Sequence, residues 1–259
     1  FRQGKEPCRA AFSGGVFSSN EREINRMRFG TIGIIGAMQE EIELLLAGME
    51  GTTSVRHAGI TYHNGTFRGR KIVVTRSGVG KVNAAVCTQV LIDRFGADAI
   101  LFTGVAGAVD PDLDIGDIVI SSSSVQHDVD VTALGFARGT IPYQEVSEFP
   151  ADARLVELAE EAGRRTFPGR CRTGKVLSGD QFIADRSAVQ ALYEQFGGAC
   201  TEMEGASVAQ VCFMNDVPHV IIRSMSDKAD GSAHANFAEF TVEAANRSFA
   251  LVDEIVKAL

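Results

Sequence analysis

Residues 200–210, CTEMEGASVAQ, place two glutamates, Glu202 and Glu204, on either side of a methionine and among small or apolar neighbours. Burial of a carboxylate is unfavourable unless hydrogen bonds or opposite charges compensate for the lost hydration. One explanation for the pair is that acidic residues at the start of a helix offset its dipole. The other is a ligand with hydroxyl groups, because an ionised carboxylate accepts several hydrogen bonds.

Further acidic residues follow apolar runs elsewhere in the chain. Glu40 and Glu41 come after the run at 28–37, and Asp227 follows the run at 218–224. Cleavage of a glycosidic bond needs one group that protonates the leaving group and another that activates water. Each general acid or base contributes roughly 10²–10⁴-fold to such a reaction. The pattern alone does not select this chemistry, because acids are also common in the first turns of helices.

Apolar runs alternate with helical patterns along the chain, and these elements must position the acids. Strands are expected at 28–37, 97–108, 115–124 and 218–224, with a hairpin or meander at 60–78. Helices are expected at 38–49, 81–96, 151–165, 185–196, 203–215 and 237–259. The sequence therefore predicts a single α/β domain with a mixed central β-sheet flanked by helices. Ligands of such sheets usually bind at the carboxyl ends of strands, here the segments 33–41, 103–108, 178–183 and 224–230.

Periodicity also gives more detailed expectations for three of these elements. The strand at 97–108 is expected to end in a glycine loop. The helix at 81–96 places one set of apolar residues on a common face, namely Val82, Ala85, Val86, Val90 and Phe95. The last helix does the same with Phe237, Phe240, Ala244, Phe249, Val252 and Val256.

Composition limits the class of protein. Of the 259 residues, 45% are hydrophobic and 22% are charged, which is ordinary for a globular protein with a sizeable core. The formal net charge is −8, from 25 basic and 33 acidic residues, and no run is rich in Lys and Arg. There is also no apolar stretch near the ~20 residues that a membrane span needs. We therefore expect a small-molecule substrate, and neither a nucleic acid nor a membrane as partner.

The cysteines and the first residues indicate where the protein works. The five cysteines, Cys8, Cys87, Cys171, Cys200 and Cys212, form no C-x-x-C pair. Neither a zinc site nor a disulfide framework is predicted, and a reducing cytoplasm fits. Cys87 and Cys212 fall in apolar helical patterns and are interpreted as small core residues. Residues 1–26 lack periodicity and are interpreted as a disordered leader or cloning remnant that precedes a domain at 27–259.

Several familiar motifs are absent. SGVGKVNAA, residues 77–85, is not a phosphate-binding loop, because Thr75 occupies the position of the first glycine and Val82 replaces the Ser or Thr. GIIGAM lacks the spacing of a dinucleotide-binding turn, and neither H-E-x-x-H nor G-x-S-x-G occurs. The sequence therefore predicts no metal and no cofactor.

Eight fragments, in this order, resemble the bacterial 5′-methylthioadenosine/S-adenosylhomocysteine nucleosidases of the purine nucleoside phosphorylase superfamily. They are GIIGAMQEE, SGVGKVNAA, TGVAGA, GDIVIS, HDVDVTALG, SGDQFI, EMEGASVAQVC and RSMSDKAD. The resemblance is collinear from about residue 29 to the end. It implies a nucleoside phosphorylase-like fold and the hydrolysis of an N-glycosidic bond without a cofactor.

The resemblance also implies roles for individual residues. Glu41 matches the glutamate that activates the attacking water, and Asp227 matches the aspartate that donates a proton to adenine N7. Both roles require shifted pKa values, which burial can supply. Glu204 is expected to accept hydrogen bonds from the ribose hydroxyls, and Glu202 to orient its loop. The remaining substrate-binding candidates are Val79, Val105, Gly107, Phe182, Ile183, Met203, Arg223, Ser226 and Phe237.

Within that set, the resemblance gives some residues finer tasks. Phe182 is expected to stack on adenine, and the backbone of Ile183 to read its edge. Met203 is expected to pack under the sugar. Arg223 and Ser226 are expected to help place the water and the loop that carries the acid.

The chain departs from the family pattern at several positions. Val105 stands where serine is frequent, which puts a hydroxyl contact to water in doubt, and Ala108 replaces a glycine. Gln39 replaces a frequent acid. The family is homodimeric, and its neighbouring subunit lends apolar residues to the pocket for the 5′-alkylthio group. Val131, Leu134 and Pro142 occupy the matching segment, with Leu134 where an aromatic residue is common.

These observations lead to one expected function and several alternatives. Glu41 would repel a phosphate dianion, so we expect hydrolysis of 5′-methylthioadenosine, S-adenosylhomocysteine and 5′-deoxyadenosine. An aminodeoxyfutalosine nucleosidase and a phosphate-dependent nucleoside phosphorylase are the alternatives within the superfamily. A nucleoside-binding protein without catalytic activity is the alternative from another class. The sequence does not rank the 5′ substituents.

Overall fold

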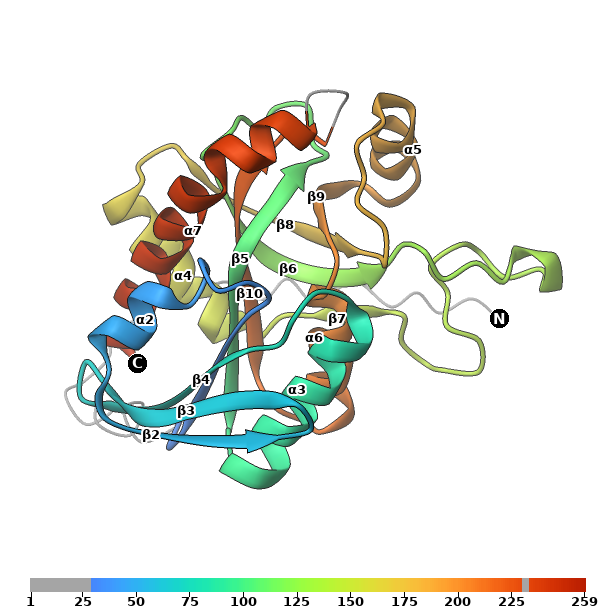
Figure 1. Ribbon diagram of the computed structural model, residues 1–259. Coiled ribbons are helices and arrows are strands. Elements are labelled where there is room, and N and C mark those ends of the chain that lie inside the picture. The colour runs from blue at the N-terminus through green and yellow to red at the C-terminus, as the bar shows by residue number, and fades with distance from the viewer. Residues whose placement is uncertain (1–28, 230–232) are drawn as a thin grey trace, which may run out of the picture.

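The computed structural model describes residues 29–229 and 233–259. In this part of the chain one mixed sheet holds β1 (Ile32–Gly36), β2 (Glu50–His57), β3 (Ile60–Phe67), β4 (Arg70–Arg76), β5 (Ala99–Ala108), β6 (Ile118–Gln126), β7 (Glu148–Pro150), β8 (Cys171–Ser178), β9 (Gly198–Glu202) and β10 (His219–Asp227). The helices are α2 (Glu43–Gly48), α3 (Lys81–Phe95), α4 (Ala153–Thr166), α5 (Arg186–Phe196), α6 (Gly205–Met214) and α7 (Ala233–Ala258), and the 3-10 turn η1 covers Thr132–Leu134. The predicted fold class, a mixed α/β sheet flanked by helices, is confirmed (Figure 1).

Strand β5 lies at the centre of the sheet. It pairs in parallel with β1 and with β10, and its last two residues pair antiparallel with β9. The strand order along the sheet is β10-β6-β8-β9-β5-β1-β4-β3-β2. Because β10 also pairs with β5, the five strands β10, β6, β8, β9 and β5 form a closed barrel. The ends of β1, β5 and β10 therefore meet those of β8 and β9.

Two apolar cores cover the two faces of the sheet. Helices α4 and α7 lie on one face, and α3 and α6 lie on the other (Figure 1). Neighbouring residues of one strand contribute to opposite cores: Ile34 and Leu101 pack with α4 and α7, whereas Ile35 and Phe102 pack with α3 and α6. Strands buried on both faces carry continuous apolar runs, which is why they are recognisable in the sequence.

Only the second half of the predicted helix at 38–49 is confirmed, because α2 covers Glu43–Gly48. Residues 37–42 instead form tight turns, in which the amides of Ile42 and Glu43 both donate to the carbonyl of Gln39. The carboxylate of Glu41 accepts hydrogen bonds from the amides just before it, which fixes these turns in place of a helical first turn. Strand β10 is longer than expected and reaches Asp227.

The predicted glycine loop at the end of the strand at 97–108 is also wrong. Gly104 and Gly107 lie inside β5, every residue of which is buried. The glycines are needed there for close approach by side chains rather than for a turn, as the site below makes clear.

The predicted face of the helix at 81–96 is only partly correct, because Val90 and Phe95 pack against the core but the fully buried residues are others. The buried residues of α3 are Ala84, Cys87, Thr88 and Leu91. Val82 is 74% exposed and Val86 is 40% exposed. Apolar residues occur all round this helix, so periodicity cannot identify the face that meets the sheet. The burial of Cys87 and Cys212 is as predicted.

The face predicted for the last helix is confirmed, since Ala244, Val252 and Val256 are buried in α7. The segment at 60–78 forms the expected pair of strands, β3 and β4. No strand was predicted at β2, β7, β8 or β9, although β8 leads into the predicted strand-end segment 178–183. The proposed leader at 1–26 lies outside the described residues. None of the described helices has the length and apolar character required to cross a bilayer.

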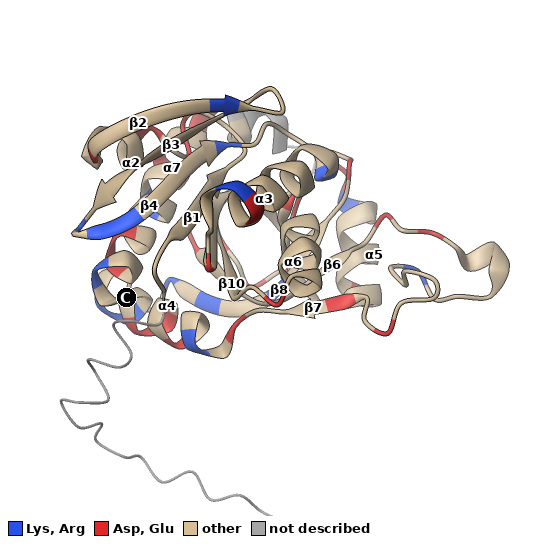
Figure 2. Cartoon of the chain, turned by 90° about the horizontal axis from the view of Figure 1, so that it is seen from below, with Lys and Arg blue, Asp and Glu red and all other residues tan. Residues whose placement is uncertain are grey.

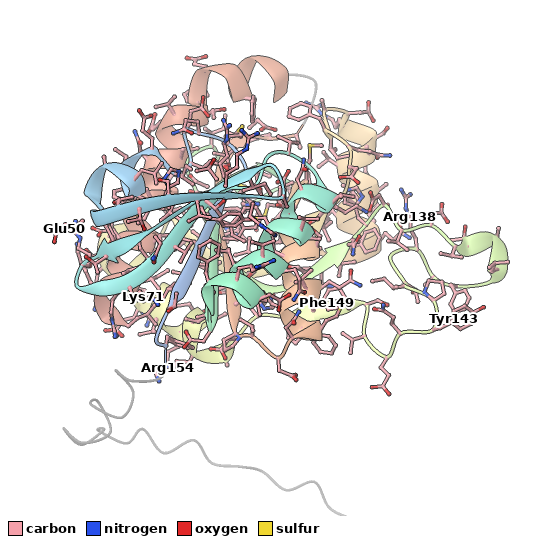
Figure 3. All side chains as sticks on the ribbon, turned by 60° about the horizontal axis from the view of Figure 1, so that its bottom comes forward. Glu50, Lys71, Arg138, Tyr143, Phe149 and Arg154 are labelled. Atoms are coloured by element: carbon pink, nitrogen blue, oxygen red, sulfur yellow. The ribbon has the colours of Figure 1, made fainter. Side chains whose placement is uncertain are left out.

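Residues 128–147, which connect β6 to β7, form an extension that we call the arm. The arm projects well beyond the body of the molecule in all three overall views (Figures 1, 2 and 3). Figure 3 shows Arg138 and Tyr143 on it, and Tyr143 is 94% exposed. The ring of Tyr143 packs edge-on against Phe136, so the aromatic residues of the arm contact each other rather than the core.

Candidate active site

A cavity of about 330 Å³ lies where the central strands end. All four strand-end segments expected from the sequence contribute to it. Its lining residues are Ala37, Met38, Glu41, Val79, Val105, Ala106, Gly107, Gln181, Phe182, Ile183, Thr201, Glu202, Met203, Glu204, Ser226, Asp227 and Phe237. Four carboxylates from distant parts of the chain therefore face one space.

Glu41 is held at one side of this cavity by backbone amides. Its Oε2 accepts hydrogen bonds from the amides of Ala37 (2.6 Å) and Met38 (2.9 Å), and its Oε1 accepts one from the amide of Val105 (3.0 Å). Only 3% of the residue is exposed. Burial raises the pKa of Glu41, while Arg223 and the three amides oppose the rise. A carboxylate placed in this way is suited to accept a proton.

The departure at Val105 has a clear structural consequence. Its backbone amide, not its side chain, donates to Glu41, so replacement of a hydroxyl residue leaves this contact intact. The side chain of Val105 is 7% exposed and lines the cavity with an apolar surface. Valine has no hydroxyl group, so the contact to water that the sequence put in doubt cannot come from this side chain.

Arg223 lies beneath the cavity and does not line it. Its guanidinium is within hydrogen-bond distance of Glu202, 3.7 Å from Glu204 and 4.0 Å from Glu41. It also lies over the ring of Phe102, 4.0 Å from the centroid. One buried cation thus neutralises part of the charge of three carboxylates, which would otherwise be strongly unfavourable.

Gly104 explains how Arg223 and Glu41 come so close together. A Cβ atom at position 104 would lie 1.9 Å from Nη1 of Arg223 and 2.5 Å from Oε1 of Glu41. Any side chain at this position would push the cation and the carboxylate apart. The glycine inside β5 is therefore required by the packing of charged groups.

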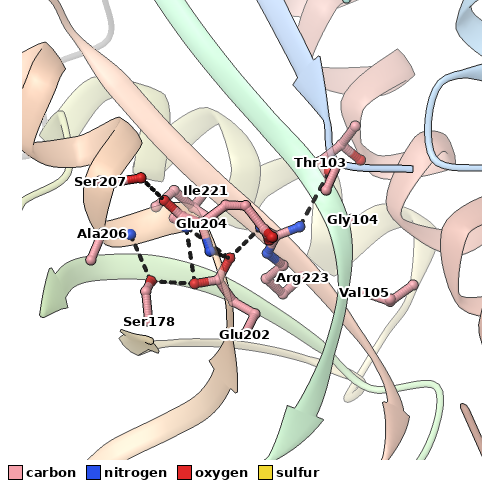
Figure 4. A network of polar contacts seen from close by, with 12 residues as sticks. Thr103, Gly104, Val105, Ser178, Glu202, Glu204, Ala206, Ser207, Ile221 and Arg223 are labelled. Atoms are coloured by element: carbon pink, nitrogen blue, oxygen red, sulfur yellow. Dashed lines mark hydrogen bonds and ion pairs between the residues drawn. The ribbon is translucent and has the colours of Figure 1, made fainter. Parts of the chain in front are cut away.

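Glu202 organises the loop that follows β9 (Figure 4). Its carboxylate accepts hydrogen bonds from the amides of Glu204 (3.2 Å) and Gly205 (2.8 Å), and it contacts the hydroxyl of Ser178 and Arg223. Ser178 in turn accepts from the amide of Ala206 at 2.7 Å. The carboxylate of Glu202 thus makes its hydrogen bonds to four groups of the protein itself, which fits the expected role in orienting the loop.

Glu204 differs from Glu202 because its carboxylate has fewer partners. Its Oε1 accepts one hydrogen bond from the amide of Gly80 at 2.7 Å, and the residue is 5% exposed. Burial raises the pKa of Glu204 to about 8, and the neighbouring Glu202 adds to the rise, while Arg223 opposes it. Glu204 is therefore a buried acceptor directed at the cavity with capacity left for hydroxyl groups.

Replacement of Glu204 by glutamine is expected to stabilise the unliganded protein. Since the pKa of Glu204 rises from 4.5 to about 8 on folding, the stability contributed by its proton is complete below pH 4.5 and is lost as the pH rises through 8. Glutamine cannot ionise and keeps an oxygen for Gly80. We expect its advantage in Tm to grow from about pH 5 and to level off above pH 8, at no less than about 2–4 °C.

Differential scanning fluorimetry from pH 5 to 9 would measure this effect. Glu157→Gln is a matched control, because Glu157 is exposed on α4. A difference in Tm between the Glu204 variant and the original protein that does not change with pH would contradict the prediction.

Asp227 faces the cavity from the end of β10. Its Oδ1 accepts from the amide of Ala229 (2.7 Å) and its Oδ2 from the hydroxyl of Ser226 (2.9 Å). The register places Asp227 beside Gly107 of β5, and Gly107 beside Thr201 of β9. A Cβ atom at position 107 would lie 2.9 Å from Oδ1 of Asp227, so the glycine leaves the carboxylate its place.

Apolar side chains form the rest of the cavity wall. The rings of Phe182 and Phe237 meet edge to face with centroids 5.7 Å apart. Phe182 is 49% exposed and Val79 is 51% exposed, so this side of the cavity is open. Met203 and Ile183 line it further inside. A flat aromatic ligand could pack against such an apolar wall.

All the predicted catalytic and substrate-binding residues line the cavity except Arg223, which contacts the carboxylates of the lining from outside it. Val131, Leu134 and Pro142 lie on the arm and do not line the cavity, and Leu134 is 69% exposed. Sequence reasoning missed Ala37, Met38, Ala106, Gln181 and Thr201 as lining residues. Met38 and Gln181 fall within the expected strand-end segments, whereas no signal marked Thr201, whose place depends on the pairing of β9 with β5.

Possible metal ligands do not gather in the described part of the chain, where no group of three His, Cys, Asp or Glu side chains could hold an ion. The carboxylates of the cavity are instead arranged around backbone amides and Arg223. The arrangement brings the buried carboxylates of Glu41 and Asp227 to one cavity, together with that of Glu204, which has capacity left to accept hydrogen bonds.

Comparison with known proteins adds independent findings. A model of the phosphorylase superfamily matches residues 31–257. The chain is 43% identical over 229 residues to the 5′-methylthioadenosine/S-adenosylhomocysteine nucleosidase of Shewanella pealeana, which covers 88% of this chain and 99% of that protein.

Solved structures are similar as well. The nucleosidase of this name from Neisseria meningitidis, in complex with methylthio-immucillin-A, is 40% identical with a TM-score of 0.86, covering 89% of this chain and 100% of that one. The futalosine hydrolase of Helicobacter pylori is 35% identical with a TM-score of 0.84, covering 88% of this chain and 98% of that one.

Proposed function

The chain belongs to the 5′-methylthioadenosine/S-adenosylhomocysteine nucleosidase family of the phosphorylase superfamily, and from this premise we propose that it releases adenine from both nucleosides by hydrolysis. The products are adenine and the 5-substituted ribose, and 5′-deoxyadenosine is a further expected substrate. Release of these by-products in the cytoplasm would serve methionine salvage and the removal of methyl-transfer waste.

The proposed reaction uses Glu41 as the base and Asp227 as the acid. Glu41 takes a proton from water as the water attacks the anomeric carbon, and Asp227 gives a proton to N7 as the bond to adenine breaks. The two carboxylates line one cavity and come from different strand ends, which supports this division of labour. The amides around Glu41 fix its orientation before substrate binds.

Other residues bind the nucleoside in this proposal. Glu204 accepts hydrogen bonds from the ribose hydroxyls, and Met203 packs under the sugar. Phe182 stacks on adenine, and the backbone of Ile183 reads its edge. All four residues line one cavity, to which Met203, Phe182 and Ile183 contribute apolar side chains, and this supports the assignment.

The single observation that favours hydrolysis over phosphorolysis is the charge of the cavity lining. Among the described lining residues, Glu41, Glu202, Glu204 and Asp227 are acidic and none is basic. The nearby Arg223 is already paired with Glu202. A phosphate dianion would meet repulsion here without a free cation to bind it, whereas a water molecule is neutral.

Adenine release should therefore be independent of phosphate. We expect the purified protein to release adenine from 5′-methylthioadenosine and from S-adenosylhomocysteine at the same rate with and without phosphate, and to leave inosine intact. Chromatographic detection of adenine measures this. A requirement for phosphate with formation of a pentose 1-phosphate would establish a phosphorylase, and binding of the nucleoside without any adenine release would establish a binding protein.

A second candidate function follows from the similarity to the futalosine hydrolase. Aminodeoxyfutalosine carries the same adenine and ribose but a larger 5′ substituent. Val79, which is half-exposed and is not assigned to adenine, leaves the cavity open on one side, and this favours tolerance of larger 5′ groups. The adenine assay should therefore include this nucleoside.

We also propose that the protein acts as a homodimer whose arms complete the sites of the partner subunits. The arm projects from the body of the molecule (Figure 3) and carries Val131, Leu134 and Pro142, none of which lines the cavity of its own subunit. Exposed apolar residues on α3 and α6, among them Val82 and Met214, support an additional contact surface. Sedimentation at micromolar concentration tests the dimer.

A further inference from the structure

Three residues from separate motifs of the sequence meet beside the cavity and have no part in the chemistry above. Lys81 comes from SGVGKVNAA, Asp128 from HDVDVTALG and Asp180 from SGDQFI. The ammonium of Lys81 donates to Oδ1 of Asp128 at 2.6 Å. The amide of Asp180 donates to Oδ2 of Asp128 at 2.9 Å, and Oδ1 of Asp180 accepts from the amide of Lys81 at 2.9 Å. These contacts close a ring.

The ring is well suited to hold a fixed geometry. The side chains of Lys81 and Asp128 are only 17% and 15% exposed. Burial favours the neutral form of Asp128, but the Lys81 ammonium and the Asp180 amide hold the pKa of this carboxyl below its usual range. Hydrogen bonds to a charged group in a partly buried place are stronger than those between neutral groups.

The ring lies between three segments that shape the nucleoside site. Asp180 precedes Phe182 and Ile183, which line the cavity, by two and three residues. Lys81 begins α3, and the amide of the preceding Gly80 donates to Glu204. Asp128 begins the arm. The adjacent amides of Gly80 and Lys81 at the start of α3 therefore hold the carboxylate of Glu204, which is proposed to bind ribose, and the carboxylate of Asp180 in the loop that carries Phe182. Helix N-termini favour such negative groups.

We propose that Lys81, Asp128 and Asp180 are positioning residues, which hold the loop 180–183 in the conformation that binds the nucleobase. This inference rests on the proposed function, because it assigns that loop to adenine. Asp128 is the centre of the ring, since its Oδ1 binds the ammonium of Lys81 and its Oδ2 binds the amide of Asp180. The catalytic carboxylates are held by other contacts and do not depend on it.

Replacement of Asp128 by alanine should therefore weaken nucleobase binding more than it slows the chemical step. We expect KM for 5′-methylthioadenosine and the dissociation constant of adenine to rise about tenfold or more, with kcat changing less than about threefold. Adenine has no 5′ substituent, so its affinity reports on the loop and not on a pocket that the arm completes. Calorimetry with adenine and steady-state kinetics measure the two effects.

Glu148→Ala is the matched control. Glu148 lies at the other base of the arm and also pairs with a lysine, Lys175 at 2.9 Å, but it does not touch the loop 180–183. Adenine affinity should be unchanged in this variant. An equal loss of affinity in both variants, or a loss of Tm in Asp128→Ala with unchanged adenine affinity, would overturn the proposal.

Variants of Lys81 give a second test that does not depend on Asp128→Ala folding well. Lys81→Met should weaken adenine binding and Lys81→Arg should largely restore it, because arginine keeps the positive charge. The double variant Lys81→Met with Asp128→Ala should bind adenine no more weakly than Asp128→Ala alone, since the two residues act on one loop. Additive losses would contradict the ring. Adenine binding without adenine release would count against the proposed function only, and a protein that binds no adenine would overturn both.

Discussion

Replacement of Asp227 by asparagine is expected to lower kcat for adenine release by roughly two to four orders of magnitude, the usual contribution of a general acid. Asparagine has the same shape, and its oxygen can still accept from the amide of Ala229. Its amide group cannot transfer a proton to the departing base. The fold and KM should change little, because the substitution removes a proton donor and not a binding surface.

Single-turnover measurement of adenine release would detect the loss even at very low rates. Asp216→Asn provides a control, because Asp216 is exposed and precedes the start of β10, far from the cavity. Its φ of 53° is one that asparagine tolerates. Near-normal turnover in Asp227→Asn would remove Asp227 from the mechanism. Loss of folded protein in that variant would mean that the carboxylate is needed for structure, so circular dichroism should accompany the kinetics.

The parts of the fold that could be predicted are those in which burial determines the residue types. Strands β1, β5 and β10 are covered on both faces, so β1 and β5 are largely apolar runs and β10 contains the apolar run Val220–Ile222. Their ends could be located, and the expectation that ligands bind at strand ends then selected the right segments. The position of Glu41 and Asp227 at these ends followed from the sequence.

Other elements left no such signal. Strand β2 is exposed along almost its whole length, so no alternation of apolar residues marks it. Strand β9 has only five residues, and its glycine and cysteine are not typical of a strand. The place of Thr201 in the cavity depends on the pairing of β9 with β5, which is a contact between residues far apart in the chain. Local patterns carry no information on such pairing.

The compensation of charge was also beyond sequence reasoning. The sequence indicated that a buried Glu202 or Glu204 would need partners, but it did not identify them. The partners are Arg223, Ser178 and backbone amides, and Gly104 makes room for Arg223. From the sequence alone Gly104 is interpreted as part of a loop. The close approach of Arg223 to this glycine becomes visible only when β10 is placed beside β5.

Replacement of Glu41 by glutamine should lower kcat by roughly two to four orders of magnitude, because the amide cannot accept the proton of the attacking water. Its oxygen can still accept from one set of amides, so the turns at 37–42 should survive. Glu40→Gln is a matched control at the next position, since Glu40 is exposed. Turnover in the control should remain within about threefold of the original enzyme.

The pH dependence of the reaction distinguishes a catalytic base from a merely structural carboxylate at position 41. Burial raises the pKa of Glu41 above its ordinary 4.5, so the fraction in the ionised, active form falls as the pH decreases through that higher value. We expect kcat/KM of the original enzyme to fall on this acidic side. The residual activity of Glu41→Gln should lack that fall, because glutamine does not titrate. An acidic limb of unchanged position in the variant would assign it to another group and would leave Glu41 without its proposed role.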